Sequence, residues 1–250
     1  MVKRDTVARA DAILISSSVD SFQIDLRKVR NVWQLYLDDS HVYPGRTERI
    51  VRFLEELSKE RRLHINGQKQ IRSRINSDQI LFSVRLLQEN GAILSDLEFG
   101  STTAGGDERF VQTGTSLEVL RIDDSVSEFL DTRASSWAAL DVFSEFLGSS
   151  DIQRVVFRKK EQQREFIAGK NPEVAEFQKV LESASCIDIT NIPSVGEETF
   201  YIELGDARHV RYRISALPSS DMILTDEGTG ASYIISAWTK ERIDRSLGFR

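Results

Sequence analysis

Apolar and polar residues alternate in several short stretches of the chain. The clearest stretches are residues 22–26 and 33–37, in which every second residue is apolar. A period of two is typical of a strand with one buried face. Similar patterns predict strands over residues 12–15, 80–87, 92–99, 109–113 and 117–122. Asn90-Gly91 supplies the residues that a tight hairpin turn requires, so two of these strands are expected to pair.

A different spacing follows Pro44. Four apolar residues recur at the period of one helical face, namely Ile50, Phe53, Leu54 and Leu57. Charged residues occupy the opposite side. Proline suits the first turn of a helix, where its missing N–H costs nothing. We therefore predict an amphipathic helix over residues 44–62, with its apolar side covered by a sheet.

The same order of elements recurs in the second half. Strand patterns occupy residues 152–157 and 165–168, after which Asn171 is expected to cap a helix that Pro172 begins. The apolar side of this helix carries Val174, Phe177, Val180 and Leu181. Further strands are predicted at 186–189, 199–204, 209–214, 222–224 and 233–235, and a final helix at 238–247.

This recurrence predicts an α+β protein built from two related modules. Each module is expected to be a mostly antiparallel sheet with a helix packed on one face. The first module is placed at residues 11–148 and the second, shorter one at 151–248, joined by Gly148-Ser149-Ser150. The interval between the two helices far exceeds a solenoid repeat, so the pattern indicates duplication of a whole domain.

Composition narrows the class of protein. A chain of 250 residues with 40% hydrophobic residues can form a substantial core, and its net charge of -6 disfavours a dedicated nucleic-acid binder. Cys186 is the only cysteine, which excludes an intramolecular disulfide, and its apolar surroundings predict a buried, inert thiol.

No apolar run is long enough to predict a membrane span. The charged first residues are followed by no apolar signal core. We therefore expect either a cytoplasmic protein or one whose export signal or anchor lies outside this sequence.

No catalytic, cofactor-binding or metal-binding set is predicted. The three histidines, at positions 41, 64 and 209, form no pair with metal-ligand spacing. Asp38-Asp39 and Asp123-Asp124 could serve a hydrolase, but they stand where turns and helix starts favour aspartate. No Gly-x-Ser-x-Gly elbow is present.

A glycine-rich loop over residues 100–107 contains candidate partner-binding residues. These are Thr102, Thr103, Gly105 and Gly106. The loop joins strands and lacks the Lys-Ser/Thr ending of a phosphate loop. It is expected to be either a mobile hairpin loop or a partner-binding loop. Trp33, Trp137 and Trp238 are expected to pack in the core or between the halves. Trp137 is also a candidate partner-binding residue, together with the segment 137–150.

Several landmarks resemble one known family. They are Val32-Trp33-Gln34-Leu35, Tyr43-Pro44 entering a helix that ends in Phe53-Leu54-Glu55-Glu56-Leu57, the strand 94–100, Phe110-Val111-Gln112, Val119-Leu120-Arg121-Ile122, Trp137 before Asp141-Val142-Phe143, and Asp151-Ile152. Over most of its length the chain is similar to the domain-of-unknown-function family of auxiliary proteins of gliding-motility-type ABC transporters.

The resemblance implies a membrane-anchored, periplasmic domain that works beside an ABC permease and ATPase. It implies an N-terminal membrane segment, which this sequence lacks, and it supplies no active-site residues. The expected function is thus a non-enzymatic, extracytoplasmic accessory or binding component of an ABC-type transport system. The alternatives are a hydrolase that uses Asp and Glu residues and a purely structural spacer.

Overall fold

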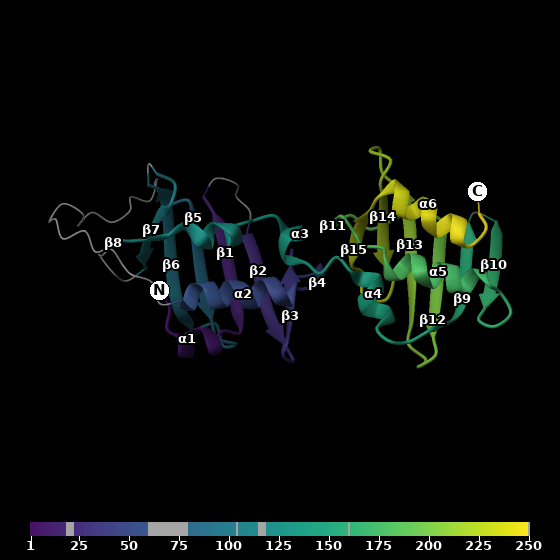
Figure 1. Cartoon of the computed structure of the whole chain (residues 1–250), viewed down its shortest axis with the longest axis horizontal. Coiled ribbons are helices and arrows are strands. Elements are labelled where there is room, and N and C mark those ends of the chain that lie inside the picture. Colours follow the sequence, from purple (N-terminus) through teal and green to yellow (C-terminus); the bar gives the residue numbers. More distant parts are fainter. Residues whose placement is uncertain (19–22, 60–79, 104, 115–118, 160, 250) are drawn as a thin grey trace. The chain divides into compact units, whose positions relative to one another are not determined.

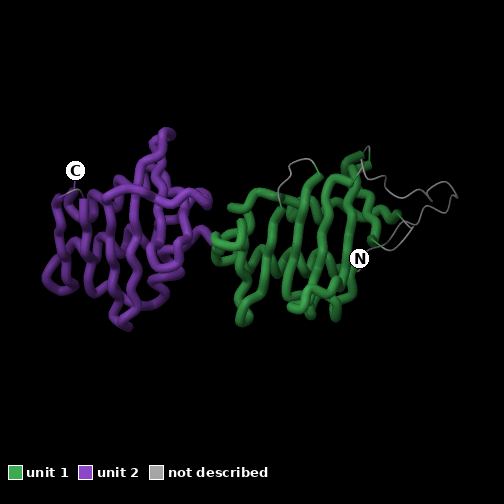
Figure 2. Tube along the Cα trace, turned by 180° about the vertical axis from the view of Figure 1, so that it is seen from behind, with its two compact units in different colours: residues 1–138 green, residues 139–250 purple. Residues whose placement is uncertain are grey.

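The computed structural model describes residues 1–18, 23–59, 80–103, 105–114, 119–159 and 161–249. The chain is α+β, with two antiparallel sheets, and it divides into two compact units, Met1–Ala138 and Ala139–Arg250 (Figure 2). No helix among the described residues is both long enough and apolar enough to cross a membrane.

Unit 1 contains an eight-stranded sheet with the strand order β4-β3-β2-β1-β5-β6-β7-β8 (Figure 1). Its strands are β1 (Ala12–Ser17), β2 (Gln23–Val29), β3 (Val32–Tyr36), β4 (Val42–Pro44), β5 (Phe82–Leu87), β6 (Ile93–Thr102), β7 (Glu108–Thr113) and β8 (Val119–Asp123). Its helices are α1 (Arg4–Ala8), α2 (Thr47–Ser58), the 3-10 helix η2 (Asp124–Phe129) and α3 (Ala134–Trp137).

The core of unit 1 follows from the alternation in its strands. In β2, Ile24 and Leu26 are buried while Asp25 between them is partly exposed. In α2, the side chains of Ile50, Phe53 and Leu57 are completely buried. The helical spacing therefore identified the buried side of α2 correctly.

The start of α2 differs from the prediction. Pro44 ends β4, where it pairs with Gln34 of β3, and the helix begins at Thr47. The backbone N–H of Gly45 still donates to Trp33 O at 2.8 Å, so pairing with β3 continues past the proline. Proline is tolerated there because β4 is an edge strand.

Unit 2 contains a seven-stranded sheet with the strand order β10-β9-β12-β13-β14-β15-β11 (Figure 1). Its strands are β9 (Ile152–Lys159), β10 (Gln162–Ile167), β11 (Asp188–Thr190), β12 (Glu198–Leu204), β13 (His209–Ala216), β14 (Met222–Asp226) and β15 (Ser232–Ile235). Its helices are α4 (Val142–Leu147), α5 (Glu173–Glu182) and α6 (Ala237–Ser246).

Aromatic side chains form the centre of unit 2. Phe200 of β12 contacts Phe177 of α5 at a ring-centroid distance of 6.0 Å and Tyr212 of β13 at 5.1 Å. Phe143 of α4 meets Tyr212 edge-on at 5.5 Å. Because α4 joins this cluster, the division between the units falls before α4, whereas the sequence placed the linker after it, at residues 148–150.

Candidate functional site

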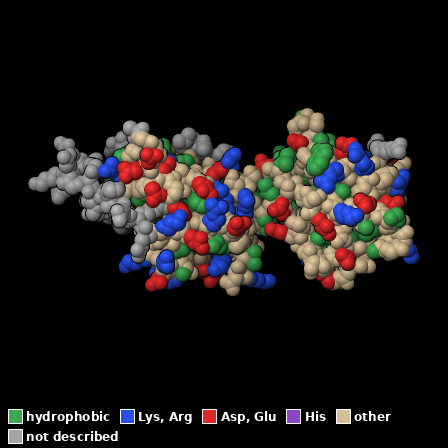
Figure 3. Space-filling model, in the orientation of Figure 1, with side chains coloured by type: hydrophobic (Ala, Val, Ile, Leu, Met, Phe, Trp, Pro, Cys, Tyr) green, Lys and Arg blue, Asp and Glu red, His purple; other side chains and the backbone are tan. Residues whose placement is uncertain are grey.

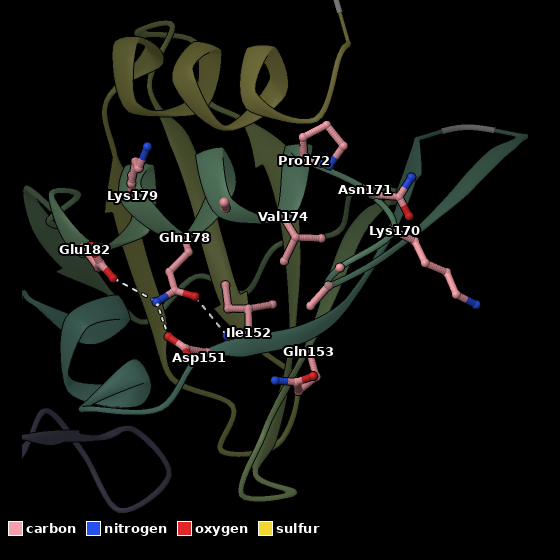
Figure 4. Close-up of a pocket in the computed structure, with 13 residues that line it drawn as sticks. Asp151, Ile152, Gln153, Lys170, Asn171, Pro172, Val174, Gln178, Lys179 and Glu182 are labelled. Atoms are coloured by element: carbon pink, nitrogen blue, oxygen red, sulfur yellow. Dashed lines mark hydrogen bonds between the residues drawn. The ribbon is translucent and has the colours of Figure 1, made fainter.

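A groove in unit 2 is the candidate site, because polar side chains from several elements line it. It has a volume of about 660 Å³ and lies between the start of β9, the turn after β10 and one side of α5 along its length (Figure 4). Its polar lining residues are Asp151, Gln153, Lys170, Asn171, Gln178, Lys179 and Glu182. The groove is therefore lined by both acidic and basic side chains.

Gln178 organises one end of this groove. Its Nε2 donates to Asp151 Oδ1 at 3.3 Å and to Glu182 Oε1 at 2.9 Å, while its Oε1 accepts from the backbone N–H of Ile152 at 3.0 Å. Figure 4 shows the three side chains pointing toward one another. One amide thus ties α5 to the start of β9 and holds two carboxylates at the mouth of the groove.

The other end of the groove is formed by the turn from β10 into α5. Asn171 Oδ1 accepts from the backbone N–H of Ile167 at 3.0 Å, and Gly169 has a φ of 76°, which favours glycine. Lys170 and Lys179 point away from the two carboxylates (Figure 4). Lys179 instead pairs with Glu176 at 3.2 Å. Neither lysine therefore pairs with Asp151 or Glu182, and Lys179 is already paired with a carboxylate of its own helix.

This arrangement suits recognition by hydrogen bonds. The carboxylates of Asp151 and Glu182 present acceptors, and the lysines present donors, to an open groove. Within the described residues, no three His, Cys, Asp or Glu side chains are placed to hold a metal ion together. His64 lies outside the described residues.

The candidate partner-binding loop forms the tip of the β6–β7 hairpin. Thr102 pairs with Arg109, Thr103 N donates to Glu108 O at 2.8 Å, and Gly106 N donates to Thr103 O at 2.9 Å. Thr102, Gly105 and Gly106 are exposed, and Gly106 has a φ of 77°. The structure therefore brings these four predicted residues to one exposed tip.

Trp137 is not a surface residue. Its side chain is completely buried, with Nε1 donating to Asp131 O at 2.6 Å and its ring edge-on to Phe53 at 5.5 Å. The guanidinium of Arg49 covers the ring at 4.9 Å. Trp137 is thus unavailable to a partner, and the prediction that it contacts one is wrong.

Trp238 is more exposed than predicted. The sequence placed it in packed surroundings, but it is 63% exposed on α6, where the guanidinium of Arg242 stacks on it at 4.5 Å. Trp33 is buried, as expected. Trp137 is followed by apolar residues, whereas Trp238 is followed by the polar run 239–242, so the local sequence already distinguished the two.

Both aspartate pairs have structural roles, as expected. Asp38 accepts from the backbone N–H groups of Ser40 and His41 at 2.8 Å, and its carboxylate lies 2.9 Å from His41 Nδ1. The hydrogen bond with His41 is the main reason that the pKa of Asp38 is lowered. Asp123 caps η2 by accepting from Ser125 N.

Sequence reasoning missed Arg109, which supports the β6–β7 hairpin. Its side chain is buried, and its Nη1 donates to Gly100 O at 2.7 Å. Its Nε donates to Asp124 Oδ1 at 2.6 Å and its Nη2 to Ser127 Oγ at 2.8 Å. The sequence did contain a signal for this role. Arg109 is a basic residue on the buried side of a predicted strand, and a buried cation requires a partner.

Comparison with known proteins adds one relative. An uncharacterized protein of Treponema pallidum (strain Nichols) is 23% identical over 218 residues, which cover 86% of this chain and 68% of the relative. No family model matches the chain. No solved structure matches it either. The relative's description names no activity, so the comparisons transfer no function to this chain.

Proposed function

We propose that this chain is a non-enzymatic, extracytoplasmic accessory or binding component of an ABC-type transport system, and that its two units are related copies of one module. The observation that carries the proposal is a shared pairing order in the two sheets. Strand β1 lies between β2 and β5, and strand β9 lies between β10 and β12, with antiparallel pairing throughout.

The correspondence continues along the chain. Strands β5 to β8 form an antiparallel meander in unit 1, and β12 to β15 form one in unit 2. Each meander is followed by a helical segment, η2 or α6. Antiparallel sheets of this size allow many strand orders, so agreement over this many neighbours supports duplication.

The helices α2 and α5 occupy corresponding positions in this order. Each follows the outward strands. The next described strand after α2 is β5, beside the central strand β1, whereas in unit 2 the edge strand β11 comes between α5 and β12, which lies beside β9. Their buried residues have the same spacing: Ile50, Phe53 and Leu57 in α2, and Val174, Phe177 and Leu181 in α5. Figure 1 draws each helix across one face of its own sheet. This supports the proposed plan of one sheet covered by one helix.

The differences between the units lie at the sheet edges. Unit 1 adds β3 and β4 beyond β2, and unit 2 adds β11 beside β15. Additions at an edge leave the central pairing unchanged, which is how copies of one module can diverge without losing their core.

The accessory role rests on the resemblance together with this plan. The exposed hairpin tip at Thr102, Thr103, Gly105 and Gly106 and the groove around Gln178 are the proposed contact surfaces. Both present backbone or side-chain hydrogen-bonding groups on a supported element, which suits binding of a protein partner.

Co-purification from membranes tests the proposal. The protein, expressed with its natural upstream sequence, is expected to co-purify with an ABC permease and ATPase. A photoreactive residue at Thr102 should cross-link to the permease, whereas the same residue at Glu241, which is 64% exposed on α6, should not. Failure to recover either transporter subunit would remove the accessory role.

A further inference from the structure

One end of the sheet in unit 1 combines three segments, which we call the hairpin end. They are α1, the turn at residues 30–31 between β2 and β3, and the turn at 88–92 between β5 and β6. Asp11 joins them: its O accepts from Lys28 N at 2.7 Å, and its Oδ2 accepts from Glu89 N at 3.0 Å. Figures 1 and 2 show α1 and both turns at the same end.

The hairpin end carries an excess of positive charge in a chain whose net charge is -6. Five cationic side chains lie in these segments or next to them: Lys3, Arg4, Arg9, Lys28 and Arg30. Three are carboxylates: Asp5, Asp11 and Glu89. None of the five cations forms an ion pair with another described residue. Figure 3 shows Lys and Arg side chains along this margin of unit 1, with fewer Asp and Glu side chains among them.

Large apolar side chains project at the same end. Val29 and Val32, which flank the β2–β3 turn, are 39% and 55% exposed, and Ile93 after the β5–β6 turn is 61% exposed. Arg30 and Asn31 have φ values of 50° and 66°, which form a tight turn and hold the two valines side by side. Exposed apolar side chains beside unpaired cations suit a surface that meets lipid.

A groove between α1 and α2 opens next to these turns. It has a volume of about 280 Å³, and its apolar lining includes Val7, Ala10, Trp33, Val51 and Leu54. Arg4 and Lys28 stand at its border, with Glu55 as its acidic lining residue. Val51, which is 42% exposed, is an apolar residue on the otherwise polar side of α2 and lies at this groove. The groove thus repeats the combination of apolar surface and positive charge.

We propose that the hairpin end of unit 1 binds the surface of an anionic lipid bilayer. Val32 and Ile93 enter the headgroup layer, while Lys28 and Arg30 face the lipid phosphates. Basic residues near an anionic bilayer attract it, and apolar side chains add binding by leaving water. This surface does not depend on the proposed accessory role.

Vesicle flotation of the full chain tests the proposal. We expect the protein to float with vesicles of phosphatidylcholine and phosphatidylglycerol, to bind less as salt rises, and to stay unbound with phosphatidylcholine alone. Equal binding to both vesicle types would overturn the assignment. So would displacement by inorganic phosphate at low millimolar concentration, because that result identifies a site for a free anion.

Variants identify the surface. Lys28→Gln with Arg30→Asn should lower the partition coefficient by about 10- to 30-fold, and asparagine tolerates the positive φ at position 30. Val32→Ser with Ile93→Ser should also lower it, but should leave its salt dependence unchanged. The matched control is Arg211→Gln with Arg245→Gln, at sites 59% and 75% exposed in unit 2. Unchanged binding in both test variants would refute the proposal.

The vesicles contain no permease or ATPase. Loss of vesicle binding would therefore leave the co-purification result untouched, and a failed co-purification would leave the lipid-binding surface standing.

Discussion

Arg109 and Asp124 form an ion pair in which the guanidinium Nε lies 2.6 Å from Oδ1, and their side chains are only 10% and 18% exposed. The pair joins β7 to the start of η2, and the same guanidinium bonds to Gly100 O at the base of the β6–β7 hairpin. One arginine therefore holds together the base of the proposed partner-binding tip and the helical segment that follows the sheet.

Replacing this arginine should destabilise unit 1. In Arg109→Ala, Asp124 loses its cation and Gly100 O loses its donor, so we expect the free energy of unfolding to fall by about 3 kcal/mol. Denaturant unfolding followed by tryptophan fluorescence measures this, because Trp33 and Trp137 are both buried in unit 1.

Arg52→Ala provides the control for that measurement. Arg52 pairs with Glu128 at 2.9 Å on the surface of unit 1, with 56% of its side chain exposed. Exposed ion pairs contribute about 0–1 kcal/mol, so this variant should unfold almost as the parent does. If both variants lost equal stability, the buried network would have no special role.

Asp131 makes the stability of unit 1 depend on acid pH. Burial by itself raises its pKa, but hydrogen bonds from Arg133 and Ser136 outweigh burial and bring the pKa to about 2. Because the folded pKa lies below the unfolded value near 3.9, Asp131 stabilises the fold above about pH 4. This contribution is lost as the pH falls toward 2.

Asp131→Asn should remove this dependence. After allowance for solvent screening, we expect the variant to be less stable than the parent by about 1 kcal/mol at neutral pH, with the difference closing near pH 2. Unfolding curves at several pH values measure it. Asp39→Asn, at an exposed turn, is the control. A stability difference that stayed constant with pH would show that the carboxylate charge is not responsible.

The regular elements were predictable because their signals are local. Alternation placed Ile24 and Leu26 on the buried face of β2, and helical spacing placed Phe53 and Phe177 in the core. Each of these patterns depends on residues that are close in sequence, and burial of one face is what gives a strand or a helix its period.

The groove and the element boundaries were not predictable, because they depend on distant contacts. The Gln178–Glu182 bond has the spacing of one helical turn, but the bond from Gln178 to Asp151 exists only because α5 meets the start of β9. The sequence likewise predicts that Pro44 begins a helix, but in the structure Pro44 pairs with β3 and ends a strand. Such contacts leave no periodic trace in the sequence.

Cys186 should be unreactive in the folded protein. Its side chain is buried, and burial raises the pKa of the thiol to about 12, so almost no thiolate forms at neutral pH. We expect no reaction with Ellman's reagent under native conditions and reaction of one thiol per chain in guanidinium chloride. The matched control is Cys186→Ser with Ser185→Cys, which moves the thiol to an exposed neighbour and should react at once. Rapid labelling of the parent protein would contradict the burial.

Trp137 and Trp238 should respond very differently to the same substitution. Trp137→Ala removes a completely buried ring and its hydrogen bond to Asp131 O, so we expect a loss of about 3–5 kcal/mol in unit 1. Trp238→Ala removes a ring that is 63% exposed and stacked on Arg242, so the loss should stay near 0.5–1 kcal/mol.

Denaturant unfolding separates the two tryptophan variants, since Trp33 remains in unit 1 as a fluorescence reporter and circular dichroism follows both units. Trp137→Phe is an intermediate case, because it keeps an aromatic ring beside Phe53 but loses the Nε1 donor. Its stability should therefore lie between those of the parent protein and Trp137→Ala. Equal losses for Trp137→Ala and Trp238→Ala would mean that the two rings share one environment, which would contradict both the burial of Trp137 and the exposure of Trp238.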